Sequence, residues 1–469
     1  MLLEQPHRKS PCPKRVFYER HRPENTTLYS IVENYRDAFF EQVENGSGHY
    51  LPHFVRKEFD ELLRCGQIDQ GFVRLKCQGC DHERWVAFSC KRRGFCVSCA
   101  TRRMHDTTFH LLESVFPAVP VRQWVLSFPF EIRFLLAVFP ELLSPFLHII
   151  QRTIQDFLCR KAQISPSEGK SGAVTAIQRF GSALNLNIHF HSIVTDGVYL
   201  LRKGKPQFKR VKPPTIKELS EILSTIVKKL FRWLVRHGYL IQDNETMHLA
   251  EQDAPTALTA LQVASITYRI AFGPRQGRKV QSIKTLPPTD EEGGELCIRH
   301  QGFSIHAQTA FHAKNQQRLS NLCRYLFRPA LAHDRLYWDE QSQVIYELKT
   351  PYRDGTTHLS FEPLEFMQKL AALVPKPWLN LIRYHGVFAP NAKWRTQIVP
   401  KKQESSDSSE PTQPTYRTPW AELLRRTFHL EMTRCPRCYG YLKVIAVITQ
   451  APVIDKMLNH VLRKRRAPP

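Results

Sequence analysis

Two histidines stand one residue apart in the stretch LNLNIHFHSIVTDGVY, residues 184–199. Side chains alternate between the two faces of a β-strand, so a strand here places His189 and His191 on one polar face with Asn185 and Asn187. The other face is apolar and suited to packing against helices: Leu184, Leu186, Ile188, Phe190 and Val194. A single core histidine is usually just hydrogen-bonded, but two neighbouring imidazoles can bind one divalent cation. The pattern therefore predicts a metal site.

A third metal ligand is expected from the preceding segment AVTAIQRFGS, which reads as a strand that turns at Gly181–Ser182. If the two strands form a hairpin, Gln178 pairs near Asn185 and lies on the polar face. A slip of one residue would turn Gln178 to the opposite face. We take Gln178 as the candidate ligand. Asp196 also has suitable chemistry, but strict alternation places it on the opposite face unless the strand ends before it.

Cysteine pairs give the second chemical signal. Cys77 and Cys80 form one C-x2-C pair, and Cys96 and Cys99 form another. Two such pairs supply the four thiolates of a tetrahedral structural zinc site. Cys65 and Cys90 are either substitute ligands or ordinary buried thiols.

A further pair, Cys435 and Cys438, lies near the C-terminus. One pair alone does not complete a zinc site, and a site there needs another partner such as His429.

The charge balance points to a polyanionic partner. The 67 lysines and arginines exceed the 43 aspartates and glutamates, which gives a formal net charge of +24. Such a surplus favours nucleic acid over a merely basic soluble protein. Four arginines surround the second cysteine pair and could contact phosphate, although a solvated basic face has the same composition: Arg92, Arg93, Arg102 and Arg103.

Membrane and secretory classes are not favoured. The most apolar stretch, residues 125–150, contains Glu131, Arg133, Glu141 and three prolines, so it predicts core helices and turns. The N-terminal residues lack the apolar segment of an export signal. Twelve cysteines in such a chain are typical of metal ligands or reduced thiols in the cytoplasm.

The sequence also predicts the domain organisation. We expect a basic irregular arm over 1–30, a zinc-binding, DNA-contacting domain over 31–115 and an α+β domain over 120–400. Residues 401–415 lack large apolar side chains and read as a flexible linker. A helix, the last C-x2-C pair and a basic tail follow over 416–469.

These motifs resemble a known family. The hydrophobic–His–hydrophobic–His pattern resembles the HUH endonucleases, and the order of features is similar to the rolling-circle insertion-sequence transposases. The similarity spans roughly residues 50–400 and includes the zinc knuckles, QRFGSALNLNIHFHSIVTDGVY and NLCRYLFRPALAHDRL. It implies an antiparallel HUH sheet with flanking helices after a four-cysteine zinc domain. It also implies a cytoplasmic, nucleoid-associated bacterial protein.

The resemblance further implies the reaction. In this family Mg²⁺ or Mn²⁺ bound by the histidines polarises a phosphate of single-stranded DNA at the ends of the element, often in a hairpin. A helix-borne tyrosine attacks it and leaves a 5′-phosphotyrosine. Tyr325 fits this role: it lies on the flank of a helical pattern that Pro329 ends, beside Arg324 and Arg328. The alternative is an interface tyrosine that packs its ring and keeps its hydroxyl in water.

One departure concerns the number of nucleophiles. Several relatives carry two tyrosines four residues apart, whereas Asn321 precedes Tyr325 here. The chain thus resembles a single-tyrosine branch. Tyr325 is then used more than once, or a second nucleophile comes from elsewhere in the chain or from another protomer of a homo-oligomer.

Three functions fit the sequence. The first is a transposase that nicks and rejoins DNA. The second is a plasmid or phage replication initiator, or a relaxase, with the same chemistry. The third is a non-catalytic zinc-dependent DNA-binding protein, which needs neither the histidine pair nor Tyr325.

Overall fold

The computed structural model describes residues 16–17, 22–243, 246–250, 256–288, 296–400 and 430–466. The described parts of 24–63 and 91–409 form one compact unit, and the described parts of 1–23, 64–90 and 410–469 form another. The expected linker over 401–415, most of the helix expected after it and His429 lie outside the described residues, as does most of the N-terminal arm.

A seven-stranded antiparallel sheet organises the larger unit. Its strands run in the order β12-β13-β4-β6-β5-β18, and β14 also pairs with β4. Their bounds are β4 Pro120–Ser127, β5 Gly172–Phe180, β6 Leu186–Thr195, β12 Cys297–His300, β13 Phe303–His306, β14 Ala310–His312 and β18 Ile382–Gly386. This sheet with helices on both faces agrees with the expected mixed α and β class.

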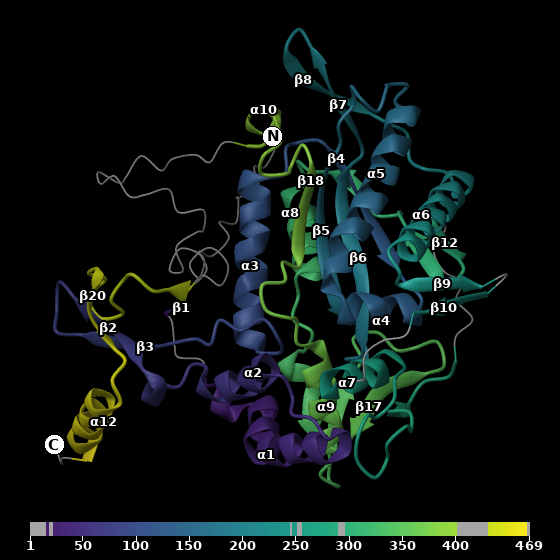
Figure 1. Cartoon of the computed structure of the whole chain (residues 1–469). Helices are drawn as coiled ribbons and strands as arrows, with labels where there is room; N and C mark the ends of the chain where they lie inside the picture. Colours follow the sequence, from purple (N-terminus) through teal and green to yellow (C-terminus); the bar gives the residue numbers. More distant parts are fainter. Residues whose placement is uncertain are drawn as a thin grey trace, which may run out of the picture. The chain divides into compact units, whose positions relative to one another are not determined.

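Helices cover the two faces of this sheet (Figure 1). On one face, β6 packs with α4 (Phe130–Val138), α5 (Leu143–Lys161) and α6 (Ile216–Arg236) in the largest apolar core. On the other face, α3 (Val97–Ser114) and α8 (Gln316–Leu326) contribute Leu111, Leu319 and Cys323 to a second core. The histidine strand is therefore enclosed between two layers of helices.

Local sequence signals start and position the covering helices. Thr215 caps α6 by accepting a hydrogen bond from the Glu218 backbone N–H, and the Glu218 side chain accepts from the Thr215 N–H in return. The apolar residues of α6 recur every three or four places and face the sheet: Leu219, Ile222, Leu223, Ile226, Val227, Leu230 and Leu234.

The remaining elements of the larger unit surround this framework. The other helices are η1 Pro23–Asn25, α1 Thr27–Ser47, α2 His53–Arg64, η3 Pro140–Leu142, α7 Ala257–Ile266, η4 His333–Arg335, α9 Pro363–Leu373 and α10 Arg395–Ile398. A four-stranded sheet contains β11 Gln281–Lys284, β17 Thr356–Phe361, β16 Val344–Glu347 and β15 Leu336–Trp338. Two hairpins are β7 Gly197–Arg202 with β8 Lys205–Arg210, and β9 Leu240–Asp243 with β10 Thr246–Leu249.

The smaller unit contains a three-stranded sheet assembled from distant parts of the sequence. Its order is β20-β2-β3, with bounds β2 Phe72–Cys77, β3 Glu83–Ala87 and β20 Leu442–Ile448. The unit also includes η2 Ile68–Gln70, α12 Ala451–Arg466 and the short parallel pair β1 Val16–Phe17 and β19 Leu430–Glu431. Residues 430–431, expected in a helix, are thus in a strand.

The apolar stretch 125–150 forms core elements, as the sequence predicts. Leu135, Leu136, Phe146 and Ile150 are buried in the largest core. Within the described residues, no helix alone has the length and apolar character to cross a membrane, and α4 with the following η3–α5 segment reaches that threshold only as a pair bent by 107°.

A buried ion pair fixes the end of the histidine strand. Arg122 on β4 donates from Nε and Nη2 to the Asp196 carboxylate, each at 3.0 Å. The two side chains are only 3% and 4% exposed. Asp196 is therefore engaged by an arginine.

Loss of this pair should destabilise the fold strongly. We expect Asp196→Ala to lower the free energy of unfolding by about 3–5 kcal/mol, because Arg122 would be left buried without its counter-charge. Urea denaturation measures the change. Asp37→Ala is the control, since Asp37 is 82% exposed in its pair with Arg36 and should cost at most about 1 kcal/mol. Equal free energies of unfolding for the two variants would contradict a stabilising role of the buried Arg122–Asp196 ion pair.

Candidate active site and zinc-binding cysteines

The two histidines lie on one face of β6, as the alternation predicts. Leu186, Ile188 and Phe190 belong to the core on the α5 and α6 side, whereas His191 contacts Tyr325 of α8 on the opposite side. The ring centroids of His189 and His191 are 4.8 Å apart. The imidazoles are thus close enough to act on one bound group.

Hydrogen bonds orient both rings. His189 Nδ1 lies 2.8 Å from the carbonyl oxygen of Asn187, and His191 Nδ1 lies 2.9 Å from the side-chain amide of Gln123. A flip of the Gln123 amide presents its oxygen to Nδ1. Each ring can then carry its proton on Nδ1 and offer an unprotonated Nε2, which is how protein groups usually orient metal-binding histidines.

Burial keeps both imidazoles neutral. Desolvation, with smaller contributions from Arg133 and Arg328, lowers the pKa of His189 to about 4. Desolvation also holds the pKa of His191 well below its usual value. The positive charge of Arg328, and that of His189 whenever it is protonated, act in the same direction. Neutral imidazole is the form that binds metal ions.

Gln178 reaches the same face by a register different from the expected one. It pairs directly with His189 and not with Asn185, because the strands begin to pair at Phe180 and Leu186 and a register shift intervenes between Gln178 and Phe180. The turn is therefore longer than expected, and Gly181 N–H donates to the Asn185 carbonyl across it. The expected face for Gln178 is confirmed, whereas the expected partner is wrong.

The Gln178 amide also holds the end of α8. Its Nε2 donates to the backbone oxygens of Tyr325 at 3.3 Å and Leu326 at 2.8 Å. The last carbonyls of a helix lack intrahelical partners, so Gln178 satisfies two of them. Only its side-chain oxygen is a candidate ligand for a metal ion.

Two substitutions of Gln178 should separate its role in anchoring α8 from its role as a metal ligand, and Gln178→Leu removes both. We expect a loss of about 1–3 kcal/mol in the free energy of unfolding, since two buried carbonyls lose their donor. Gln178→Glu keeps a ligand oxygen but removes the donor, so it should be destabilised as well. Chemical denaturation tests both, with the exposed Gln207→Leu as the control. Full stability of Gln178→Glu would contradict the anchoring role.

Tyr325 projects from the last turn of α8 beside the histidines. Its ring meets that of His191 edge-on, with centroids 5.8 Å apart and an interplanar angle of 89°. The residue is 42% exposed. Tyr325 is therefore a partly exposed hydroxyl-bearing side chain next to the imidazole pair.

Cations surround the Tyr325 ring. The Arg328 guanidinium lies 4.9 Å from its centroid and Lys349 Nζ lies 5.7 Å from it. Arg324, in contrast, donates to Asn321 Oδ1 at 2.6 Å and is occupied within the helix. Sequence reasoning missed Lys349 and Gln123, because each comes from a segment remote from the motifs and carries no spacing signal.

Two polar atoms in this region support binding of an additional group. His191 Nε2 and Arg328 Nε are buried without a hydrogen-bond partner among the described residues. Native proteins rarely leave such atoms unsatisfied. A cation on Nε2 and a phosphate near the guanidinium would satisfy both, so the residues fit a divalent metal ion and a nucleic-acid backbone.

The cysteines group differently from the expected single site. Within the smaller unit, Cys77 and Cys80 gather with Cys435 and Cys438, and the four sulfurs lie within 4.8 Å of one another. This grouping differs from the predicted set of Cys77, Cys80, Cys96 and Cys99. The physical reason is the pairing of β2 with β20, which brings the C-terminal pair to Cys77 and Cys80.

The basic residues around Cys96 make contacts within the protein. Arg93 Nη1 donates to the Leu379 carbonyl at 2.6 Å. Arg92 forms an ion pair with Glu61 at 3.6 Å, and Arg103 donates to the backbone oxygens of Lys91 and Arg92. These contacts hold the loop before α3, and a DNA-binding role for Arg92, Arg93, Arg102 and Arg103 stays a prediction.

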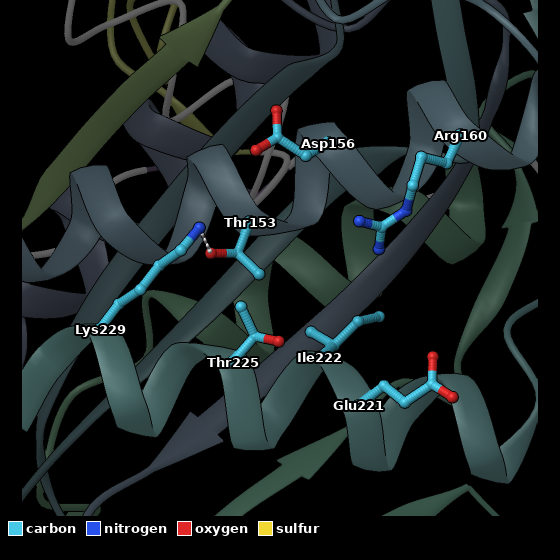
Figure 2. Close-up of a pocket in the computed structure, with 7 residues that line it drawn as sticks. All are labelled: Thr153, Asp156, Arg160, Glu221, Ile222, Thr225 and Lys229. Carbon is cyan, nitrogen blue, oxygen red and sulfur yellow. Dashed lines mark hydrogen bonds between the residues drawn. The ribbon is translucent and has the colours of Figure 1, made fainter.

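A cavity of about 390 Å³ lies between α5 and α6, on the layer that covers the other face of the sheet. Figure 2 shows side chains of both charge signs around it, including Asp156, Arg160 and Glu221. Lys229 Nζ donates to Thr153 Oγ1 at 3.4 Å within it. None of the residues proposed for the histidine–tyrosine site lines this cavity.

Comparisons with known proteins identify two matching regions. Residues 172–395 match a family model described as "Putative transposase", and residues 31–128 match one described as "Transposase zinc-binding domain". No curated protein and no solved structure matches the chain. The first region contains His189, His191, Gln178 and Tyr325.

These matches indicate transposase families, which bind and cleave DNA. The zinc-binding match and the clustered cysteines support structural zinc.

Proposed function

We propose that the chain is a transposase that nicks and rejoins single-stranded DNA through a covalent tyrosine intermediate. The observation that supports this most directly is the position of Tyr325, whose ring lies 5.8 Å from that of His191. A nucleophile and a pair of neutral metal-binding side chains then act on the same phosphodiester.

The proposed step exchanges one phosphodiester for another. The Tyr325 hydroxyl oxygen attacks phosphorus and gives up its proton, while the bond from phosphorus to the 3′ oxygen breaks. The 3′ oxygen takes up a proton and leaves as a hydroxyl, and the 5′ phosphate stays on the tyrosine. The phosphodiester to the 3′ oxygen is replaced by a phosphodiester to tyrosine and is not hydrolysed. The reverse attack by a 3′-hydroxyl can therefore rejoin a strand.

The surrounding side chains support this step electrostatically. Arg328 and Lys349, which flank the Tyr325 ring, would offset the negative charge that develops on phosphate oxygens. His189 and His191 would hold Mg²⁺ or Mn²⁺, which supplies Lewis-acid polarisation of the phosphate. Gln178 holds the end of α8 against β5 and so keeps the nucleophile near the imidazoles.

The transposase reading is preferred over a replication initiator or relaxase because of the two family matches. A non-catalytic DNA-binding protein would not require a half-exposed tyrosine beside a half-buried and a buried imidazole whose pKa values are both lowered. We propose element ends, presented as single strands or hairpins, as the DNA substrate.

Mapping a covalent adduct tests the proposal. The full chain is incubated with Mn²⁺ and hairpin-bearing single-stranded oligonucleotides that carry candidate element ends, then denatured and digested. We expect a DNA-linked peptide modified at Tyr325, identified by mass spectrometry. A covalent adduct on another residue would overturn the assignment of the nucleophile, and cleavage without any adduct would overturn the covalent mechanism.

A further inference from the structure

Four cysteines from opposite ends of the chain converge in the smaller unit. Sγ of Cys77 lies 3.4 Å from that of Cys438, and Cys80 Sγ lies 3.7 Å from Cys435 Sγ and 3.4 Å from Cys438 Sγ. A disulfide would need about 2.05 Å between sulfurs. Four thiolates about 2.3 Å from a tetrahedral zinc ion lie about 3.8 Å from one another. The observed spacing suits a shared metal ion.

Both C-x2-C segments have the backbone form of a metal knuckle. Gly79 N–H donates to Cys77 Sγ at 3.3 Å, and Arg437 N–H donates to Cys435 Sγ at 3.4 Å. Each bond turns the chain so that the second cysteine of the pair points to the same centre. These N–H groups also offset the negative charge of thiolates.

A glycine allows the two knuckles to approach each other. A Cβ atom added to Gly440 would lie 3.0 Å from Cys77 Sγ and 3.3 Å from Cys438 Sγ. A larger residue would therefore crowd the sulfurs, and glycine is the residue that permits close backbone approach.

The sheet supplies the frame for this convergence. β2 pairs with β20 from Phe72–Ile448 to Cys77–Leu442. Beyond the strand ends, Gln78 N–H donates to the Tyr441 carbonyl at 3.0 Å and Cys435 N–H donates to the Gly440 carbonyl at 2.8 Å. The hydrogen-bonded ladder thus runs directly into the cysteine group. Two independent features, strand pairing and sulfur geometry, join the same segments.

We propose that Cys77, Cys80, Cys435 and Cys438 bind one structural Zn²⁺, and that the C-terminal segment 430–466 is an integral part of the zinc-binding unit. Cys435 and Cys438 lie outside both matched regions, which end at residues 128 and 395. Cys80 and Cys435 are 355 residues apart in sequence. The ion would therefore fasten the segment 430–466 to β2 after residues 91–409 of the larger unit have been synthesised.

Zinc stoichiometry and thiol protection in the full chain test this proposal. We expect Cys435→Ser/Cys438→Ser and Cys77→Ser/Cys80→Ser each to lose one equivalent of zinc relative to the wild type, measured by elemental mass spectrometry. The paired control Cys159→Ser/Cys297→Ser changes two cysteines that belong to no candidate metal cluster and should keep the wild-type zinc content. Unchanged zinc in either test variant would overturn the proposal.

Protection of Cys435 and Cys438 from alkylation, and its dependence on Cys77 and Cys80, gives the sharper measurement. In the native wild type, Cys435 and Cys438 should resist iodoacetamide until a chelator is added. In Cys77→Ser/Cys80→Ser they should react at least about tenfold faster, as mapped by peptide mass spectrometry, because their thiolates lose the shared ion. Continued protection in that variant would show that the C-terminal pair binds zinc without Cys77 and Cys80, and the proposal would fail.

A ligand-conserving variant separates metal loss from misfolding. Cys438→His keeps a zinc-binding side chain at an exposed position and should retain the equivalent of zinc that Cys438→Ser loses. Cobalt substitution of both gives a spectroscopic readout, since replacing one thiolate by imidazole shifts the tetrahedral absorption bands. Identical zinc content and spectra in the His and Ser variants would contradict ligation by Cys438.

Discussion

Tyr325→Phe should abolish the covalent protein–DNA adduct and reduce strand cleavage by on the order of 10³-fold or more, because the nucleophilic oxygen is removed. The ring itself stays. Its contacts with His191 and Arg328 are made by the aromatic face and edge, so the fold and DNA affinity should change little. Cleavage is measured with labelled single-stranded oligonucleotides, and adducts are resolved by denaturing electrophoresis.

A matched tyrosine provides the control for this result. Tyr337 is 41% exposed, almost the same as the 42% of Tyr325. It lies on β15 of the four-stranded sheet, however, and not on α8 beside the histidine strand. Tyr337→Phe should cleave at the wild-type rate and form the adduct. If Tyr325→Phe cleaved as fast as Tyr337→Phe, Tyr325 would be an interface residue, and the covalent mechanism would need another nucleophile.

The alternation of polar and apolar residues allowed the central strand to be predicted. In LNLNIHFH every second residue is apolar, and Leu186, Ile188 and Phe190 enter the core that α5 and α6 complete. The period of two is a local property of the chain, so one strand suffices to predict the shared face of His189 and His191. The helix around Tyr325 is also confirmed, since α8 spans Gln316–Leu326, and its apolar spacing is equally local.

Pairing between segments could not be predicted in the same way. Gln178 lies opposite His189 because of a register shift after a longer turn, and neither feature has a signal in AVTAIQRFGS. The grouping of the cysteines could not be predicted from the sequence for the same reason. All C-x2-C pairs are chemically alike, so sequence proximity favoured Cys96 and Cys99 as partners of Cys77 and Cys80, whereas the β2–β20 ladder brings the C-terminal pair there.

Residues from remote segments that orient the site could also not be predicted from the sequence. Gln123 approaches His191 from β4, and Lys349 approaches Tyr325 from the loop after β16. Their residue types are common on any basic surface. Only the tertiary arrangement places Gln123 and Lys349 at the site. Substitutions of these two residues would therefore test the structure and not the sequence motif.

Replacing both imidazoles should leave the fold intact and remove catalysis. We expect His189→Ala/His191→Ala to lower Mn²⁺-dependent cleavage by more than about 100-fold, since loss of even an outer partner of a metal ligand typically costs about 10–100-fold. The variant should still bind the oligonucleotide and still possess Tyr325, so its defect lies in the polarisation of the phosphate. Manganese binding, followed by electron paramagnetic resonance, should weaken in parallel with cleavage.

His385 supplies the control for this prediction, because it is another histidine of the same sheet whose pKa burial lowers to about 4. It pairs with Ala173 on β5, a residue of the core on the α5 and α6 side, so it faces away from Tyr325. His385→Ala should therefore keep manganese binding and cleavage even if its stability falls. Wild-type cleavage by the double variant, or by the wild type in excess chelator, would exclude a metal-assisted attack by Tyr325. Loss of activity in the double variant alone would show that the face of the sheet, and not the number of buried imidazoles, determines catalysis.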